Sequence, residues 1–210
     1  MSVKVSVIYY SATGGVHRLA QAVAHGATAA GADVRLRRVP ELVPEAAINA
    51  DAIRPERLDT VATAVPEATL DDLEWADAYA FGTPTRFGNV SAQLKHFLDS
   101  TAGLWREGVF VDKPVTAFTA AHNTHGGNET TLASLNSVFI HWGSVIVAPG
   151  YTDPLVYAAG GNPYGTSFIS GANELPSAAT LEAARYQGRR LVDIASRLVS
   201  PRSALAASGR

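Results

Sequence analysis

Short apolar segments alternate with amphipathic helical segments along this chain, and that alternation constrains the fold more than any other feature. Apolar and β-branched residues mark five expected strands, at residues 3–10, 33–39, 75–81, 115–119 and 144–147. Apolar residues at helical spacing mark the helices between and after them, the last running from about residue 177 to residue 199. Such alternation favours an α/β fold, in which helices cover both faces of a parallel sheet.

Two segments interrupt this pattern. Four prolines break any long element between residues 40 and 72, so we expect short helical turns on the surface there. Residues 150–176 are rich in Gly, Pro, Asn and Tyr, and are expected to form a long loop of the kind that is usually functional. We predict a single domain over residues 1–200 that carries these two insertions, followed by a flexible tail at residues 201–210.

Charge and composition exclude several classes of function. The 210 residues include 17 basic and 19 acidic side chains of interspersed sign, for a net charge of −2. That distribution argues against nucleic-acid binding and against a basic membrane-binding patch. The absence of cysteine excludes disulfides and thiolate chemistry. Because no apolar run reaches the roughly 20 residues that span a bilayer, we expect a cytoplasmic protein without membrane insertion.

Ligands of parallel sheets bind beyond the carboxyl ends of the strands, which directs attention to the loop after the first strand. That loop consists of Ser11, Ala12, Thr13, Gly14, Gly15 and Val16. Its hydroxyls, backbone N–H groups and following helix N-terminus suit an anion. It matches neither a G-x-G-x-x-G dinucleotide loop nor a lysine-containing Walker A loop, which suggests a terminal monophosphate such as that of FMN. A plain strand–helix turn that requires glycine is an equally good explanation at this point.

A second unusual loop follows the third expected strand. It consists of Gly82, Thr83, Pro84, Thr85, Arg86, Phe87, Gly88 and Asn89. Proline fixes φ and glycine permits close backbone approach, so the loop can present its backbone to the edge of a flat heterocycle. Phe87 can supply an apolar edge, and Arg86 can meet negative charge on a reduced flavin or a nicotinamide nucleotide. The alternative is a rigid turn with a solvated arginine.

Residues 82–91, with the sequence GTPTRFGNVS, resemble the signature stretch of the WrbA family of quinone oxidoreductases. Further segments that match the family in the same order are FLD at 97–99, TAGLW at 101–105, HGGNET at 125–130, HWG at 141–143, GGNPYG at 160–165 and ARYQG at 184–188. The resemblance implies a flavodoxin-like three-layer sandwich with a five-stranded parallel sheet in the order 2-1-3-4-5. It further implies FMN as cofactor, NAD(P)H and quinones as substrates of a two-electron ping-pong reaction, and a homotetramer.

The resemblance also assigns roles to individual positions. Residues 11–16 hold the FMN phosphate, and the second loop lines the isoalloxazine through Pro84, Thr85, Arg86, Phe87, Gly88 and Asn89. A third loop completes the flavin site with Ala120, Ala121, His122, Asn123, Thr124 and His125. Trp105 from a neighbouring subunit lies over the ring, and His141 reaches the substrate space, where it could orient or protonate the quinone.

The chain departs from the family pattern at Thr13, where many relatives have tyrosine, and in a bulkier loop at residues 122–125. The preference between NADH and NADPH and the size of the quinone therefore stay open. His122, His125 and Glu129 lack a known zinc spacing, so no metal site is predicted. Two other functions fit the same fold: a flavodoxin-type electron carrier, for which a charge of −2 is weak, and an FMN-binding regulatory protein without a substrate.

Overall fold

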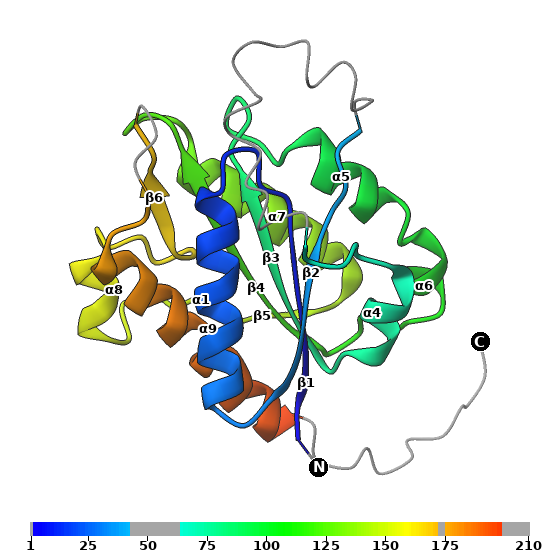
Figure 1. Ribbon diagram of the computed structural model, residues 1–210. Coiled ribbons are helices and arrows are strands. Elements are labelled where there is room, and N and C mark those ends of the chain that lie inside the picture. Colours follow the sequence, from blue (N-terminus) through cyan, green and yellow to red (C-terminus); the bar gives the residue numbers. More distant parts are fainter. Residues whose placement is uncertain (1, 43–63, 172–174, 199–210) are drawn as a thin grey trace.

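One parallel sheet organises the computed structural model, which describes residues 2–42, 64–171 and 175–198. In this part of the chain its strands are β1 (Lys4–Tyr9), β2 (Asp33–Arg38), β3 (Ala78–Pro84), β4 (Pro114–Ala121), β5 (Val145–Ile146) and β6 (Ser167–Ile169). They are ordered β2-β1-β3-β4-β5, β6 also pairs with β4, and each pairing is parallel (Figure 1). The predicted α/β fold class and strand order are confirmed.

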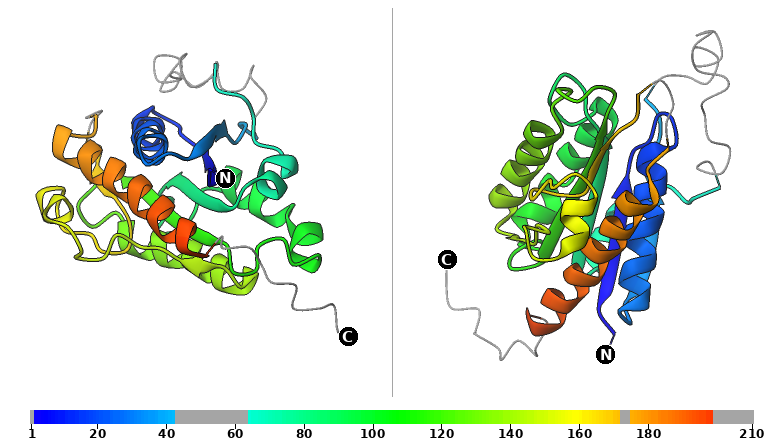
Figure 2. Two further views of the ribbon diagram at one scale, coloured as in Figure 1. Left: turned by 90° about the horizontal axis from the view of Figure 1, so that it is seen from below. Right: turned by 90° about the vertical axis from the view of Figure 1, so that its left-hand side faces the viewer.

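Helices cover both faces of this sheet. They are α1 (Gly15–Ala29), α4 (Leu70–Trp75), α5 (Ala92–Asp99), α6 (Ala102–Arg106), α7 (Asn128–Trp142), α8 (Pro154–Ala158) and α9 (Ala178–Leu198). Helices α1 and α9 lie side by side on one face, and α4, α5, α6 and α7 lie on the other (Figure 2). Each face has its own apolar core. Every residue of β3 and β4 is buried, as expected for central strands covered on both faces.

Two glycines set the distance between α1 and α9. A Cβ added to Gly26 would lie 2.0 Å from the carbonyl oxygen of Arg185, and one added to Gly188 would lie 2.1 Å from that of Val23. Both glycines thus let the two backbones approach more closely than any larger residue would. This crossing fixes α1 against the sheet, and so fixes the loop that precedes α1.

The third strand begins later in the chain than the sequence predicts. Residues 70–75 form helix α4, and β3 begins only at Ala78. A reciprocal capping box between Thr69 and Asp72 starts the helix, and the guanidinium of Arg35 lies 4.1 Å from the ring of Trp75. The local capping box and the tertiary contact with Arg35 together outweigh the apolar character of the segment. Of the expected surface turns at residues 40–72, residues 43–63 lie outside the described part of the chain.

Residues 150–176 do not form one continuous loop, contrary to the expectation. Helix α8 and strand β6 lie within this segment. Strand β5 pairs with Pro114 and Val115 of β4, whereas β6 pairs with Thr119, Ala120 and Ala121 further along the same strand. The fifth position of the sheet is therefore shared by two short strands, and the segment between them is an insertion. The signal for β6 in the sequence is only three residues long, too short for periodicity to detect.

Candidate functional site

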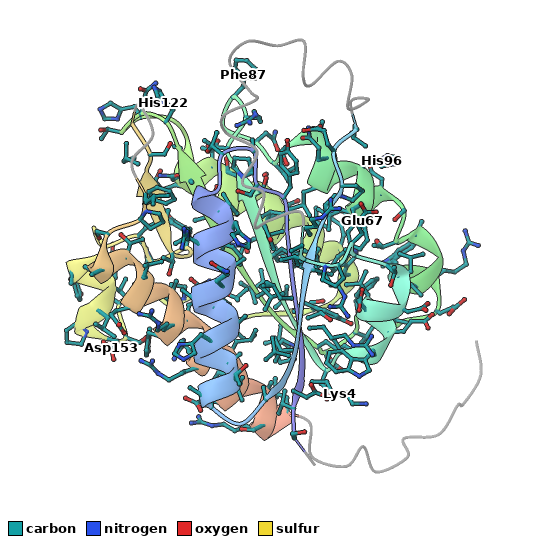
Figure 3. All side chains as sticks on the ribbon, viewed as in Figure 1. Lys4, Glu67, Phe87, His96, His122 and Asp153 are labelled. Atoms are coloured by element: carbon teal, nitrogen blue, oxygen red, sulfur yellow. The ribbon has the colours of Figure 1, made fainter. Side chains whose placement is uncertain are left out.

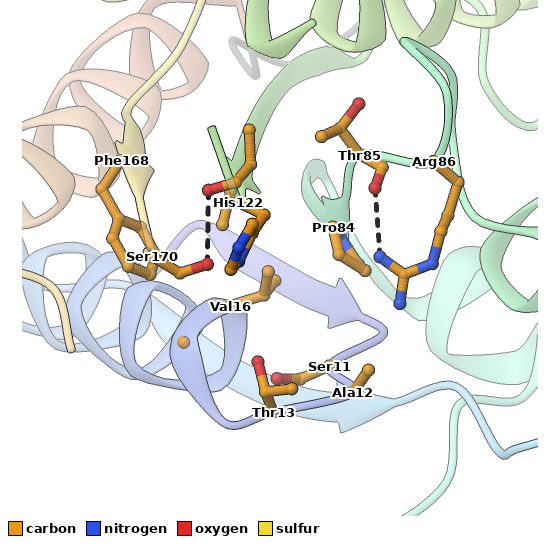
Figure 4. A pocket seen from close by; sticks show the side chains of 13 residues that line it. Ser11, Ala12, Thr13, Val16, Pro84, Thr85, Arg86, His122, Phe168 and Ser170 are labelled. Atoms are coloured by element: carbon orange, nitrogen blue, oxygen red, sulfur yellow. Dashed lines mark hydrogen bonds between the residues drawn. The ribbon is translucent and has the colours of Figure 1, made fainter. Parts of the chain in front are cut away.

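A pocket opens where the loops after β1, β3 and β4 meet, at the carboxyl edge of the sheet. Its volume is about 190 Å³. The described residues that line it are Ser11, Ala12, Thr13, Gly15, Val16, Pro84, Thr85, Arg86, Ala120, Ala121, His122, Phe168 and Ser170. Figure 4 shows these side chains converging from three loops and from the segment around β6. Three segments far apart in the sequence, each singled out for its composition, thus contribute to one cavity.

The first loop presents a helix N-terminus to this pocket. Gly14 is the N-cap of α1, with φ of 86°, and no side chain caps the helix. The hydroxyl of Ser11 instead accepts a hydrogen bond of 3.1 Å from the backbone N–H of Gly14. The first N–H groups of a helix lack partners within the helix and attract anions. This end of α1 therefore has the geometry of a phosphate-binding site.

Gly15 is constrained by the opposite wall. A Cβ at this position would lie 2.6 Å from Cζ of Phe168, a distance that side-chain carbons do not adopt. Phe168 is itself 8% exposed and belongs to the core between α1, α9 and the sheet. The phenyl ring thus packs directly against the backbone at Gly15.

The second loop is a tight turn anchored to the third. The backbone N–H of Thr85 donates to the carbonyl of Ala120 at 2.8 Å, and Arg86 and Asn89 exchange backbone hydrogen bonds of 2.8 and 3.0 Å. Phe87 and Gly88 lie between Arg86 and Asn89. Their φ angles are 52° and 74° respectively, as in a type I′ turn. Phe87 is fully exposed at its tip, and Figure 3 shows Phe87 and His122 at the same end of the molecule.

Among the described residues that line the pocket, the charged side chain is basic. Arg86 is held by a 3.0 Å hydrogen bond from its Nη1 to the carbonyl of Thr85. The imidazole of His122 projects into the pocket from the end of β4 (Figure 4). No acidic side chain is found among the described residues that line the cavity. The site therefore favours an anionic ligand on electrostatic grounds.

The predicted site residues fall into two groups around this pocket. Most of the predicted residues in the first loop line the pocket, and so do Pro84 to Arg86 and Ala120 to His122. Seven other predicted residues lie in the same loops without lining the pocket: Gly14, Phe87, Gly88, Asn89, Asn123, Thr124 and His125. Phe168 and Ser170 were missed. Their only signal was their position in a Gly/Pro-rich segment, because the pairing of β6 with β4 that brings them to the site is a long-range contact.

Trp105 and His141 lie elsewhere in the same chain. The indole Nε1 of Trp105 donates to the carbonyl of His141 at 2.9 Å, and both residues line a second cavity of about 230 Å³ beside α5 and α7. His141 lies near the end of α7, roughly 20 Å along the helix from Asn128 at its start, given a rise of about 1.5 Å per residue. Neither Trp105 nor His141 lines the first pocket within this chain.

Among the described residues, no three His, Asp or Glu side chains gather closely enough to hold a metal ion. Within those same ranges no helix combines the length and the apolarity needed to cross a bilayer.

Comparisons with known proteins agree with one another. The profile of a family described as NADPH-dependent FMN reductase matches residues 3–153. A protein named NAD(P)H dehydrogenase (quinone) from Deinococcus radiodurans is 41% identical over 198 residues, covering 94% of this chain and 98% of the relative. One of the same name from Paracoccus denitrificans is 43% identical over 211 residues, covering 97% and 99%.

Solved structures include a flavodoxin, WrbA-like protein from Agrobacterium tumefaciens, with a TM-score of 0.66 and 28% identity over 94% of this chain and 99% of that one. A flavodoxin from the domain Archaea matches with a TM-score of 0.62 at 17% identity, covering 92% and 99%. The second likeness concerns the fold alone.

Proposed function

The chain belongs to the NADPH-dependent FMN reductase family, and on this premise we propose that it is an FMN-dependent NAD(P)H:quinone oxidoreductase. The resemblance to the WrbA family is confirmed by the relatives named as quinone dehydrogenases and by the WrbA-like structure. The observation that carries the proposal is the open N-terminus of α1 beside a cavity whose charged lining side chain, among the described residues, is basic. Because NAD(P)H is the reductant, we further propose that the protein works in the cytoplasm.

The residues present fit FMN. The uncapped N–H groups at the start of α1 and the hydroxyls of Ser11 and Thr13 suit its phosphate. The pocket wall from Pro84 to Arg86 suits the flat ring system, because the proline is rigid and the backbone at Thr85 is tied to β4. When bound, FMN supplies the two-electron chemistry that links NAD(P)H to a quinone.

The protein's own part is to bind, orient and neutralise charge. Arg86 and His122 offer positive or protonatable groups at the pocket, where they favour anionic ligands and the negative charge that reduction creates. Phe168 packs against Gly15 at the start of α1 and forms an apolar wall of the cavity. The exposed Phe87 at the tip of the second loop offers an apolar surface to an incoming aromatic substrate.

The decisive experiment combines a spectrum with an assay. Purified or reconstituted protein should show flavin absorbance, release FMN rather than FAD, and reduce quinones with NADH or NADPH. Failure to bind FMN at micromolar concentration would overturn the proposal. Flavin binding without quinone turnover would instead favour an electron carrier or a regulatory protein.

We expect ping-pong kinetics, because a single cavity must serve the nicotinamide donor and the quinone acceptor in turn. Double-reciprocal plots of rate against NAD(P)H concentration, taken at several quinone concentrations, should give parallel lines. Intersecting lines would indicate that both substrates bind together and would contradict the expectation.

We also expect a homotetramer. Trp105 lines the second cavity and is 52% exposed, and large apolar side chains exposed on a surface can mark subunit contacts. Such a contact is also the route by which Trp105 and His141 could approach a flavin pocket. Light scattering at assay concentration should give four chain masses; a monomer would remove both residues from the proposed site.

Thr13 offers a test of nucleotide binding. Its side chain is exposed at the pocket and does not cap α1, so Thr13→Tyr adds a ring at the cavity without removing a cap. An aromatic contact contributes roughly 0.5–1.5 kcal/mol beyond its buried area, so we expect KM for NADH or NADPH to fall by about three- to tenfold. The Kd for FMN should hardly change, because the backbone donors of α1 and the hydroxyl of Ser11 remain. An unchanged KM would show that position 13 has no part in nucleotide binding.

A further inference from the structure

Gln187 occupies the break in the fifth strand of the sheet. Strand β5 pairs with β4 as far as Val115, and β6 pairs with it from Thr119 onward. The β4 residues between these points have no strand partner on this edge among the described residues. Gln187 belongs to α9, which packs over this part of the sheet, and its side chain is 1% exposed.

The amide of Gln187 makes three hydrogen bonds across that break. Its Nε2 donates to the carbonyl of Ala117 at 2.7 Å and to the hydroxyl of Thr116 at 2.6 Å. Its Oε1 accepts from the backbone N–H of Thr166 at 2.8 Å. The Gln187 side chain therefore donates to β4 where that strand lacks a strand partner, and accepts from the residue that immediately precedes β6. Buried polar groups require such hydrogen-bond partners.

From Thr166 the contacts lead directly to the pocket. The carbonyl of Thr166 accepts from the N–H of Thr119 at 3.1 Å, which begins the pairing of β6 with β4. Two residues later Phe168 packs against Gly15 of the first loop. At the end of β6 the N–H of Ser170 donates to the carbonyl of Ala121 at 2.8 Å. Phe168 and Ser170 both line the pocket.

We propose that Gln187 is a positioning residue for the flavin site, acting through β6 to hold Phe168 against the phosphate-binding loop. The inference rests on the proposed function, because it takes FMN as the ligand of the pocket. Without the three hydrogen bonds, the N–H of Thr166 and the carbonyl of Ala117 lose their buried partner, which is costly. Strand β6 then occupies its binding-competent position for a smaller fraction of the time, and apparent affinity falls by that fraction.

Gln187→Leu keeps the approximate volume of the side chain and removes all three hydrogen bonds. We expect the Kd for FMN, from fluorescence titration of FMN-free protein, to rise roughly tenfold if β6 is correctly placed about a tenth of the time. Arg190→Met is the matched control. Arg190 lies on the same helix and its Nε donates at 3.0 Å to the carbonyl of Ala148, at the other end of the insertion. That variant should leave the Kd for FMN unchanged.

A double-mutant cycle separates positioning from general destabilisation. Phe168→Ala alone should also weaken FMN binding roughly tenfold, and the double variant with Gln187→Leu should be no more than about twofold worse than Phe168→Ala. Effects that multiply to about a hundredfold would overturn the inference. A lower melting temperature with unchanged FMN affinity in Gln187→Leu would show a purely structural role and would overturn it as well.

Hydrogen exchange provides a readout that does not depend on FMN. In FMN-free Gln187→Leu protein, peptides covering residues 163–171 should exchange at least tenfold faster, while peptides of α7 exchange as in the wild type. Unchanged exchange at residues 163–171 would overturn the inference even if FMN binds as proposed. If Gln187→Leu fails to fold, Thr116→Val removes a single one of the three bonds and should show the same changes in smaller measure. Wild-type protein that binds no FMN would overturn the proposed function separately.

Discussion

Gly15→Asp should weaken FMN binding by about 100-fold while leaving the protein folded. The substitution places a carboxylate at the first position of α1, on the wall of the pocket. A phosphate carries nearly two negative charges at neutral pH, and like charges about 4 Å apart repel by roughly 1 kcal/mol in water and about 4 kcal/mol near a protein surface. About 2.8 kcal/mol corresponds to the expected 100-fold change. Equilibrium titration of FMN-free protein measures it.

Gly15→Asn separates charge from shape. Both substituted side chains would push against Phe168 to the same degree, so asparagine should weaken binding by no more than about tenfold. Because salt screens exposed charge, the difference between the two variants should shrink as ionic strength rises. An acidic residue in the first turn stabilises a helix, so Gly15→Asp should melt no earlier than Gly15→Asn. Equal affinities for FMN in the two variants would show that the phosphate does not lie at this helix terminus.

The parts of the fold that depend on local patterns could be predicted from the sequence. Strands β1 and β4 are buried on both faces apart from Lys4 and read as short, mainly apolar segments, and α9 has its apolar residues at helical spacing. Element boundaries that are set by tertiary contacts could not be predicted from the sequence. Trp75 looks like the start of a strand because it is aromatic and apolar, yet it ends helix α4, where its ring contacts Arg35 of β2.

The same division holds at the candidate site. Residues of the first and second loops stand out because glycine, proline and hydroxyl side chains follow apolar strands, and most of them line the pocket. Phe168 and Ser170 stand out in no such way. They reach the pocket only because three residues of β6 pair with the end of β4. Gln187, which bridges the break in the fifth strand, lies later in the chain on α9, a helix whose sequence pattern is otherwise ordinary. Long-range pairing of so short a strand leaves no periodic signal.

A buried carboxylate on α4 joins that helix to strand β2 of the sheet. Asp72 is 3% exposed, and its carboxylate accepts hydrogen bonds from Arg35 Nη1 at 3.1 Å, from Arg37 Nε at 3.0 Å and from the backbone N–H of Thr69 at 3.1 Å. The backbone carbonyl of the same residue accepts from Ser6 Oγ at 2.6 Å. Residues of β1 and β2 therefore both bind Asp72 of α4, β1 through the backbone carbonyl and β2 through the carboxylate.

Asp72→Ala should destabilise the protein by about 3 kcal/mol. Removal of one partner from a buried ion pair costs about 3–5 kcal/mol. The lower end applies here because the side chains of Arg35 and Arg37 are 34% and 22% exposed and can regain water. Asp72→Asn keeps the capping acceptor and should cost less. Urea unfolding followed by circular dichroism measures the difference, and a loss below about 1 kcal/mol in Asp72→Ala would show that the network adds little to stability.

The acid dependence of stability tests the charge of Asp72 directly. Burial by itself raises the pKa of Asp72, but the hydrogen bond from the Thr69 backbone, the charge of Arg37 and the hydrogen bond from Arg35 outweigh it and hold the pKa below its ordinary value of 3.8. Below that pH the unfolded chain binds a proton that the folded chain does not, so the free energy of unfolding decreases as pH falls toward the folded-state pKa. Above about pH 5 both states are ionised and this contribution is constant. Asp72→Asn should therefore lose stability less steeply than the wild type below pH 4, by up to about 1.4 kcal/mol per pH unit. If the free energy of unfolding falls equally steeply with pH in the two proteins, the carboxyl of Asp72 has the same pKa in the folded and unfolded states. The arginine pair would then stabilise the charge of Asp72 no better than water does.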